Sequence, residues 1–182
     1  RPLPPEHVAL REARGRALRP AVTAPHPLPP FANTAMDGFA VRAADLAGAS
    51  EGAPVTLAVA AVLPAGRVLD RALAQGTCAR IMTGAAIPDG ADAVVTVEDA
   101  EWLGALSAPG KARFRRPART GENVRRAGAD LAAGALALEA GRELSPHDLA
   151  LAASLGFGTL AVGPRPRVAV FSTGDELLDI EA

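Results

Sequence analysis

The sequence predicts a mixed α/β fold built from several subdomains, and three patterns along its 182 residues support this prediction. A proline-opened segment near the N-terminus and a later Ser-Pro-His-Asp segment predict helices. Short apolar stretches between residues 54 and 116, separated by Gly and Pro turns, predict a small β barrel or roll. A continuous apolar run at residues 167–171 predicts a strand buried on both faces, as in parallel sheets.

The composition excludes several classes of protein. The net charge is −1, from 19 basic and 20 acidic residues, so we expect no nucleic-acid or anionic-membrane partner. Hydrophobic residues make up 49% of the chain, which is typical of globular proteins rather than disordered ones. The single cysteine, Cys78, excludes an internal disulfide framework and fits a reducing compartment. Because the sequence also lacks a signal-peptide pattern and a long apolar run, we expect a cytoplasmic protein.

The N-terminal region predicts a helix followed by an extended arm. Pro4, Pro5 and Glu6 suit the first turn of a helix that runs to about Leu18. Proline is tolerated there because its missing N–H has no helical partner to lose, and the acid complements the helix dipole. Five prolines at residues 20–30 then predict an extended arm without regular structure.

Four stretches in the middle of the chain predict strands. In residues 55–63, the apolar side chains of Val55, Leu57 and Val59 recur at period two, which indicates a strand with one buried face. The other three predicted strands are at residues 77–82, 93–98 and 112–116.

A second helix is predicted from Ser145, because Ser145, Pro146 and Asp148 have the order of a capping box with proline in the first turn. Gly156 ends it, and residues 159–162 predict a strand. A Gly-Pro-Arg-Pro linker then leads to the apolar strand 167–171. A buried parallel strand needs neighbours on both sides, so we expect the chain to be the N-terminal part of a longer protein, ending one strand into an α/β domain.

Polar residues precede one predicted strand. Asn33, Thr34 and Asp37 crowd together just before Gly38, where a ligand or metal could approach the backbone closely. An Asp-Gly pair is also a standard turn signal, so a simple hairpin turn is the alternative.

Two further segments could hold an oxyanion. At Thr83 and Gly84 a strand ends with a hydroxyl and a predicted free N–H, although a plain strand–turn–strand is the alternative. Arg125 and Arg126 could clamp an oxyanion through charge-assisted forks, although adjacent residues on a strand face opposite ways. A solvated charged run is the alternative there.

The fourth segment follows the apolar strand 167–171. Open α/β sheets bind ligands at the carboxyl ends of their strands, so Ser172, Thr173 and the backbone at Gly174 could hold oxyanions. Asp175 and Glu176 offer hard oxygen ligands for Mg²⁺. A structural role is equally compatible with this pattern. His and Cys lack zinc-ligand spacing, and no P-loop, GxSxG or GxGxxG occurs, so local chemistry predicts an anion and metal site without naming a substrate.

Taken together and in order, these segments resemble the bacterial MoeA and gephyrin E-domain family of molybdopterin molybdenumtransferases. The segments that carry the resemblance are Pro-Pro-Phe-Ala-Asn-Thr-Ala-Met-Asp-Gly-Phe-Ala-Val, Arg-Ile-Met-Thr-Gly-Ala, Gly-Glu-Asn-Val-Arg-Arg, Leu-Ala-Ala-Ser-Leu-Gly and Pro-Arg-Val-Ala-Val-Phe-Ser-Thr-Gly-Asp-Glu-Leu. The chain departs from the family's usual residues at Ala32, Phe39 and Ala129.

The resemblance implies a specific architecture. An elongated helix and strand subdomain for dimerisation is expected at residues 1–40 and 131–163, with a β-rich, barrel-like subdomain inserted at residues 41–130. Residues 164–182 would begin a molybdopterin-binding α/β domain, whose remaining part is absent from this sequence.

The resemblance also implies a function in molybdenum cofactor biosynthesis. The implied enzyme takes adenylylated molybdopterin and molybdate, uses Mg²⁺ to hydrolyse the adenylate, and releases AMP. Its active site would be shared between the two chains of a homodimer, with Asp37 and Thr83 contributed across the dimer. Asp130 and Glu176 would be further catalytic acids, and Asp175 and Glu176, on the pterin-domain side, would bind the metal.

The implied substrate contacts are the residues singled out above: Asn33, Thr34, Gly84, Arg125, Ser172, Thr173 and Gly174. The molybdopterin adenylyltransferase is a further expected partner, and the present chain alone is expected to be inactive. The alternatives are a non-catalytic dimerisation or scaffold module of the gephyrin E-domain type and a generic phosphate-handling hydrolase.

Overall fold

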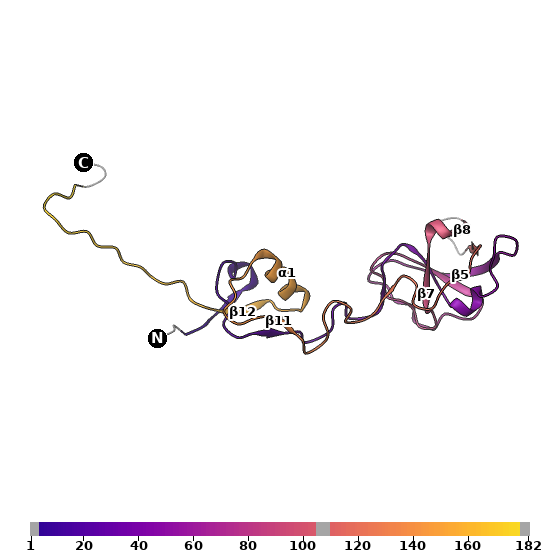
Figure 1. Ribbon diagram of the computed structural model, residues 1–182, viewed down its shortest axis with the longest axis horizontal. Helices are drawn as coiled ribbons and strands as arrows, with labels where there is room; N and C mark the ends of the chain where they lie inside the picture. Colours follow the sequence, from indigo (N-terminus) through magenta and orange to yellow (C-terminus); the bar gives the residue numbers. More distant parts are fainter. Residues whose placement is uncertain (1–3, 105–109, 179–182) are drawn as a thin grey trace. The chain divides into compact units, whose positions relative to one another are not determined.

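The computed structural model describes residues 4–104 and 110–178, so positions 1–3, 105–109 and 179–182 of the predicted subdomains lie outside the described residues. The chain divides into two compact units (Figure 1). One combines Arg1–Thr23 with Leu136–Ala182, and the other is Ala24–Ala135. No helix within the described ranges has the length and hydropathy needed to cross a bilayer.

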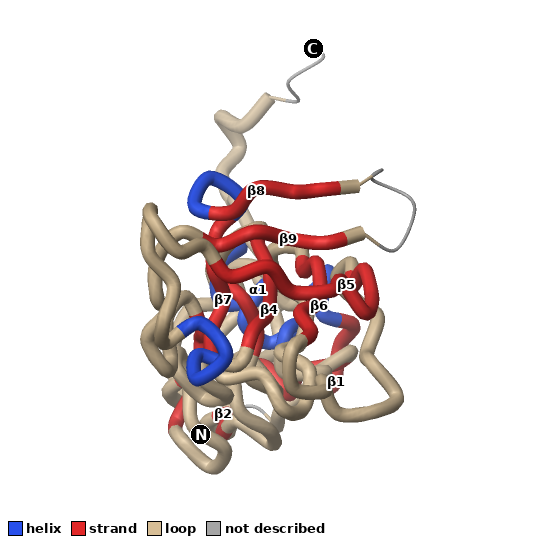
Figure 2. The backbone as a smooth tube through the Cα atoms, turned by 90° about the vertical axis from the view of Figure 1, so that its right-hand side faces the viewer, coloured by secondary structure: helices blue, strands red, loops and turns tan. Residues whose placement is uncertain are grey.

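The unit Ala24–Ala135 is built around a curled six-stranded sheet with the order β7-β4-β6-β5-β9-β8. Its strands are β4 (Gly38–Val41), β5 (Val55–Leu63), β6 (Thr77–Ile81), β7 (Ala93–Thr96), β8 (Ala100–Leu103) and β9 (Lys111–Phe114). Figure 2 shows β8, β9 and β5 side by side. The four predicted strands are confirmed to within a few residues, whereas β8 was not predicted.

Strand β5 joins the two halves of this sheet. Its first half pairs antiparallel with β9, and its second half pairs parallel with β6. The register of the β5–β6 pairing shifts between Val59 and Ala61. Bulges bend a strand and increase its twist, so this irregularity helps the sheet to curl.

Both faces of strand β4 are buried. Along β4, Phe39 and Val41 belong to one hydrophobic cluster, and Ala40 between them belongs to another. The larger cluster also contains Phe114. Exposed and buried residues alternate along β5, and its buried Leu57 belongs to this cluster. Because successive strand residues point to opposite faces, this alternation holds β4 in one register.

Glycine is required at the start of β4. A Cβ atom built on Gly38 would lie 2.2 Å from the backbone oxygen of Val95 and 2.9 Å from Val94 Cγ1. Strands β4 and β7 can therefore approach each other at this point only because residue 38 has no side chain.

Two short strands and two 3₁₀ helices complete this unit. Strand β3 (Asn33–Thr34) pairs antiparallel with β10 (Val124–Arg125), apart from the main sheet. The 3₁₀ helices are η2 (Ala43–Leu46) and η3 (Val97–Asp99). Residues 24–28 and 131–135 run beside each other, with the N–H of Ala24 donating to the carbonyl of Ala135 at 2.9 Å.

The described residues of the other unit form two short antiparallel strand pairs, one α-helix and one 3₁₀ helix. Strand β1 (Glu6–Ala9) pairs with β12 (Thr159–Val162), and β2 (Val22–Thr23) pairs with β11 (Leu136–Leu138). The single-turn 3₁₀ helix η1 (Leu10–Glu12) follows β1. These elements and α1 (Pro146–Ser154) enclose a small core that includes Leu18, Leu144, Leu160 and Val162.

The helix predicted from Pro4 to about Leu18 is wrong. Its apolar stripe consists mostly of alanine, and backbone pairing with β12 brings Val8 opposite Leu160 instead. The tertiary contact outweighs the weak local preference for a helix. The predicted strand at residues 159–162 is confirmed as the partner in this pair.

The predicted helix from Ser145 is confirmed as α1. The Ser145 hydroxyl accepts from the Asp148 N–H at 3.3 Å, and the Asp148 carboxylate accepts from the Ser145 N–H at 2.8 Å. This reciprocal pair is a capping box, and Pro146 occupies the first turn as expected. After the helix, Gly156 has a φ of +84°, the left-handed conformation that closes helix C-termini.

The predicted parallel strand at residues 167–171 is not formed. Its apolar side chains are exposed, with fractions of 79% at Val168, 86% at Val170 and 87% at Phe171. A central parallel strand needs hydrogen-bonding neighbours and cover on both faces. Within residues 4–104 and 110–178 no strand pairs with this segment, so it lies as an extended, unpaired stretch.

Candidate functional site

Two of the predicted site residues, Asp37 and Thr83, are in direct contact. Asp37 lies immediately before β4 and Thr83 follows β6, and these strands pair antiparallel with Gly38 opposite Ile81. The pairing places the two side chains at the same end of the sheet, although they are 46 positions apart in sequence. Asp37 Oδ1 accepts from the Thr83 backbone N–H at 2.7 Å and from the Thr83 hydroxyl at 2.8 Å.

These contacts favour the ionised form of Asp37. The Thr83 N–H, the Thr83 hydroxyl and the positive charge of Arg80 lower the pKa of Asp37 below its ordinary value, against a smaller opposing effect of desolvation. Only Oδ1 is occupied: within the described residues, no side-chain or backbone donor is bonded to Oδ2. Asp37 is exposed, so its free carboxylate oxygen is available to a ligand.

The turn around Asp37 is held by Thr34 and Gly84. The buried Thr34 hydroxyl donates to the Met36 carbonyl at 2.6 Å and accepts from the Met36 N–H at 3.1 Å. The N–H of Gly84 donates to the Thr34 carbonyl at 3.0 Å. The sequence-based expectation of a free N–H at this turn is therefore wrong, because a neighbouring strand takes it up.

The predicted arginine segment adjoins the same turn. In the β3–β10 pair, Arg125 lies opposite Asn33, and the Arg125 guanidinium donates to the carboxylate of Asp130. The structure thus pairs two predicted site residues, both of which remain about half exposed.

Asn123, which sequence reasoning did not select, ties this segment to the Asp37 turn. It has a φ of 55°, a left-handed conformation that Asn adopts more readily than most residues. Its Nδ2 donates to the Val94 carbonyl at 2.8 Å, and its own carbonyl accepts from the Ala35 N–H at 3.2 Å. No local pattern in the Gly-Glu-Asn sequence indicates these long-range contacts.

Arg80 is a second residue that sequence reasoning missed. It lies on β6 directly opposite Phe39, and its guanidinium carbon is 5.4 Å from the centroid of the Phe39 ring. Arg80 Nη1 donates to the Gly38 and Ile81 carbonyls, each at 2.9 Å. A charged residue inside a buried strand needs such partners, and that is the sequence signal that could have found it.

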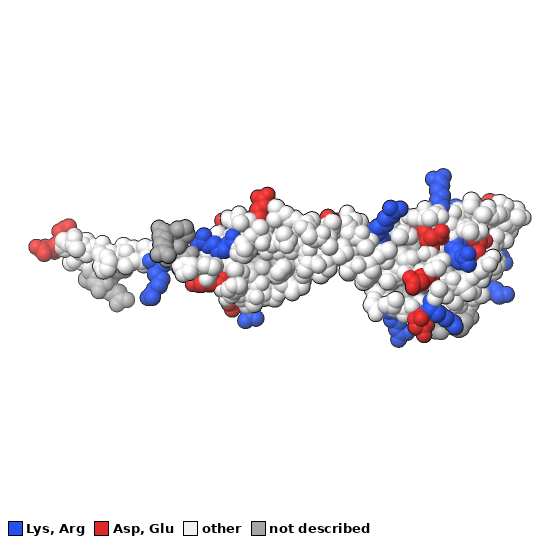
Figure 3. Space-filling model, turned by 90° about the horizontal axis from the view of Figure 1, so that it is seen from below, with Lys and Arg blue, Asp and Glu red and all other residues white. Residues whose placement is uncertain are grey.

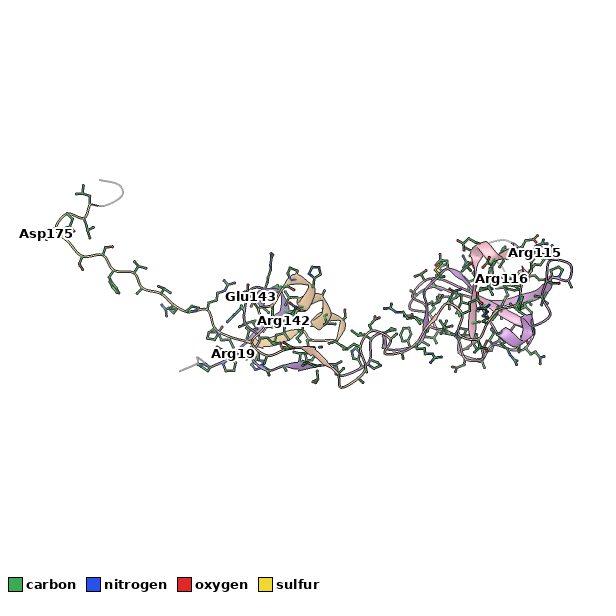
Figure 4. All side chains as sticks on the ribbon, viewed as in Figure 1. Arg19, Arg115, Arg116, Arg142, Glu143 and Asp175 are labelled. Carbon is green, nitrogen blue, oxygen red and sulfur yellow. The ribbon has the colours of Figure 1, made fainter. Side chains whose placement is uncertain are left out.

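Several charged side chains elsewhere in this unit pair with one another. Arg116 donates to Asp99 at 2.6 Å and to Glu122 at 2.7 Å, and the bond from Arg116 lowers the pKa of Glu122. Figure 4 labels Arg115 and Arg116 on the β-rich unit. Figure 3 shows basic and acidic residues interspersed on its visible face. We therefore interpret this cluster as a structural network rather than an anion site.

The predicted residues of the fourth segment lie on the extended stretch that follows β12. Ser172, Thr173 and Glu176 are exposed, as is Asp175, which Figure 4 labels. The only backbone hydrogen bond described here runs from the Leu177 N–H to the Gly174 carbonyl. These residues and Asp37 belong to different compact units, so a shared cavity between Asp37 and Glu176 stays a prediction.

Metal-ligating side chains do not cluster within the described ranges. No group of three or more His, Cys, Asp or Glu residues is placed to hold an ion there. Cys78 is buried in the core as a free thiol, and burial raises its pKa to about 12. It is therefore a core residue rather than a nucleophile.

Comparison with known proteins identifies relatives of this chain. A molybdopterin molybdenumtransferase 2 of Mycobacterium tuberculosis is 46% identical over 173 residues, covering 95% of this chain and 42% of that protein. The molybdopterin molybdenumtransferase of Bacillus subtilis is 39% identical over 177 residues, covering 96% of this chain and 40% of its own length. The chain therefore spans about two fifths of these curated relatives.

A solved structure and a family model agree with these relatives. The crystal structure of the molybdopterin biosynthesis MoeA protein from Pyrococcus horikoshii OT3 matches with a TM-score of 0.81 and 35% identity, covering 89% of this chain and 41% of that one. The family model that describes the MoeA N-terminal region, domains I and II, matches residues 1–156. Because that match covers most of the sequence, this chain belongs to the MoeA N-terminal family.

Proposed function

We propose that this chain is the N-terminal part of an enzyme that inserts molybdate into adenylylated molybdopterin and releases AMP. Support comes from the relatives named molybdopterin molybdenumtransferase. The observation that carries the proposal is the Asp37–Thr83 contact, which sets an ionised, exposed carboxylate beside a threonine inside the region that matches the family.

In this proposal Asp37 acts at the reacting centre. The contacts that lower the pKa of Asp37 stabilise its charged form, so Oδ2 can accept a hydrogen bond from a water molecule and hold that water in position. The Thr83 N–H and hydroxyl restrict the orientation of the carboxylate, which reduces the entropy lost when substrate binds.

The other predicted residues have supporting roles. We assign Arg125 and Asp130 to one mixed-charge contact beside the site, and Asn33, Thr34 and Gly84 to the turn that shapes it. Ser172, Thr173, Gly174 and the acids Asp175 and Glu176 would be supplied by the exposed stretch that follows β12.

The donor chemistry of this chain fits Mg²⁺. The exposed carboxylates of Asp175 and Glu176 are hard oxygen ligands of the kind that Mg²⁺ prefers. When bound, the ion would neutralise negative charge on the phosphate and molybdate oxygens.

The assembly belongs to the same proposal. We expect a homodimer in which the Asp37 side of one chain faces the Glu176 side of its partner. Residues 1–40 and 131–163 would then form the dimerisation region. Residues 41–130 would form the β-rich region, and residues 164–182 would belong to the pterin-binding region. The molybdopterin adenylyltransferase would supply the substrate, and the buried free thiol of Cys78 is compatible with a cytoplasmic location.

The test is AMP release by the full-length protein with adenylylated molybdopterin, molybdate and Mg²⁺. Replacing Asp37 by Ala should lower kcat by about two orders of magnitude, as for loss of a group that stabilises the transition state. Asp70→Ala is the matched control, since Asp70 is an exposed aspartate of the same unit without a described side-chain bond.

Undiminished turnover in the Asp37 variant would remove the site assignment. A wild-type protein that dimerises but releases no AMP would instead favour the non-catalytic scaffold module. Mass spectrometry of the released nucleotide separates the proposed reaction from generic phosphate hydrolysis.

A further inference from the structure

One nitrogen of Arg80 bridges the two backbone segments that carry Asp37 and Thr83. Nη1 donates to the carbonyl of Gly38, the residue after Asp37, and to the carbonyl of Ile81, two residues before Thr83. Both distances are 2.9 Å, which is typical of N–H to carbonyl hydrogen bonds. The Arg80 side chain therefore connects the two strands at the end of the β4–β6 ladder, next to Asp37 and Thr83.

The position of the guanidinium is itself constrained. The Phe39 ring, which is 1% exposed, lies under it at 5.4 Å in a cation–π geometry. Phe39 in turn packs edge-on against Phe114 with ring centroids 5.8 Å apart. The arginine is thus fixed from below by a ring that the core holds in place.

The backbone at Asp37 is also held on its other side. The Val97 N–H donates to the Asp37 carbonyl at 3.1 Å, so the first residue of η3, which directly follows β7, holds one side of the Asp37 peptide. On the β6 side, the Arg80 side chain adds its bond to the Gly38 carbonyl to the strand pairing of Gly38 with Ile81.

We propose that Arg80 is a positioning residue that holds residues 37–38 against residues 81–83 and so fixes the hydrogen-bonded geometry of Asp37 and Thr83. The idea rests on the proposed function only for its effect on turnover, because the geometric effect can be measured without substrate. The charge of Arg80 also contributes to the lowered pKa of Asp37, after the two Thr83 bonds.

The structural test uses the present chain and NMR spectroscopy. The Thr83 amide donates to the Asp37 carboxylate, so its proton shift should follow the Asp37 titration in the wild type. In Arg80→Met the pKa of Asp37 should rise towards its ordinary value, and the amplitude of the Thr83 amide titration should fall at least twofold. Arg113→Met is the control, since Arg113 lies on β9 and pairs with Glu101 on the neighbouring strand.

Arg80→Lys separates charge from geometry and guards against a variant that fails to fold. The lysine keeps the positive charge but cannot present the planar guanidinium fork to both carbonyls. We expect a smaller rise in the Asp37 pKa than with methionine, and still a reduced Thr83 amide amplitude. If the amide amplitude stays at the wild-type value in both Arg80 variants, the positioning role is refuted.

The kinetic arm uses the full-length enzyme. Arg80→Lys should lower kcat about tenfold or more with little change in KM, because a positioning residue acts on the site and not on the substrate. A raised KM at unchanged kcat would overturn the proposal in favour of direct substrate binding. Absence of AMP release in the wild type would count against the proposed function and leave the NMR result to decide the role of Arg80.

Discussion

Replacing Gly38 by alanine should destabilise the β-rich unit strongly. The added methyl carbon would lie 2.2 Å from the Val95 oxygen, 2.9 Å from Val94 Cγ1 and 3.0 Å from the Val95 carbonyl carbon. Two of these three atoms are backbone atoms of β7, which pairs with β4 over four residues. The clash therefore cannot be relieved by rotating one flexible side chain.

The expected loss follows from the cost of overpacking. Extra methyl groups in a packed core typically cost about 1–3 kcal/mol, and the backbone contact at Gly38 puts this change at the upper end, near 3 kcal/mol. The reduced flexibility of an unfolded chain with Ala in place of Gly offsets only about 0.4–1 kcal/mol. For a denaturant slope of about 2 kcal/mol/M, the urea midpoint should fall by roughly 1 M or more.

The assay is urea unfolding followed by tryptophan fluorescence. Trp102 is the only tryptophan of the chain and lies on β8 of this unit, with its ring centroid 5.5 Å from that of Phe39. Its emission therefore reports unfolding of the six-stranded sheet. Gly52→Ala is the control, since a Cβ there meets no atom within 4 Å, and its free energy of unfolding should stay within about 0.5 kcal/mol of the wild-type value. Equal midpoints for the two variants would refute the packing argument.

Two other changes test local features of the fold. Ser145→Ala removes the capping-box hydroxyl and should cost α1 about 1 kcal/mol, measured by amide hydrogen exchange of the helix. The Ser145 hydroxyl is the main cause of the lowered pKa of Asp148, so the related stability is present above the ordinary value of 3.8 and is lost as pH falls through the folded-state pKa. Amide protection of α1 should therefore drop in acid, and less so in the alanine variant; an identical acid response in both proteins would contradict this. Asn123→Ala should destabilise the β-rich unit by about 1 kcal/mol more than Asn123→Gly, because both lose the bond to Val94 but only glycine tolerates the positive φ. Equal urea midpoints for these two variants would show that the backbone conformation has relaxed.

Signals confined to a few adjacent residues predicted their structures well. The Ser-Pro-His-Asp segment defines α1 because a capping box needs only residues three apart. The strand at residues 55–63 followed from its alternating apolar side chains, since the face that they form is buried.

Elements that depend on distant partners were not predictable in the same way. Residues 6–9 form β1 because β12, about 150 positions later, supplies the hydrogen bonds. The run 167–171 has the composition of a central strand, but composition cannot supply the neighbours that such a strand requires.

The same distinction between local signals and distant partners applies to the candidate site. The residue types at Asp37 and Thr83 could be selected from sequence, because polar groups beside glycines at strand ends indicate ligand sites. Their mutual contact, and the bridge from Arg80, follow from the β4–β6 register, which no local pattern specifies. Asn123 was missed for the same reason, since its contacts are with Ala35 and Val94.

The chain enters and leaves the β-rich unit through adjacent residues. Thr23 and Leu136 are partners in the β2–β11 pair, and Ala24 is hydrogen-bonded to Ala135 immediately beyond them. Replacing the intervening 24–135 segment by a two-residue turn would convert β2 and β11 into an ordinary hairpin. Each unit is thereby a separable module. Transplanting the β-rich unit between MoeA proteins requires only two splice points, which lie side by side in the structure.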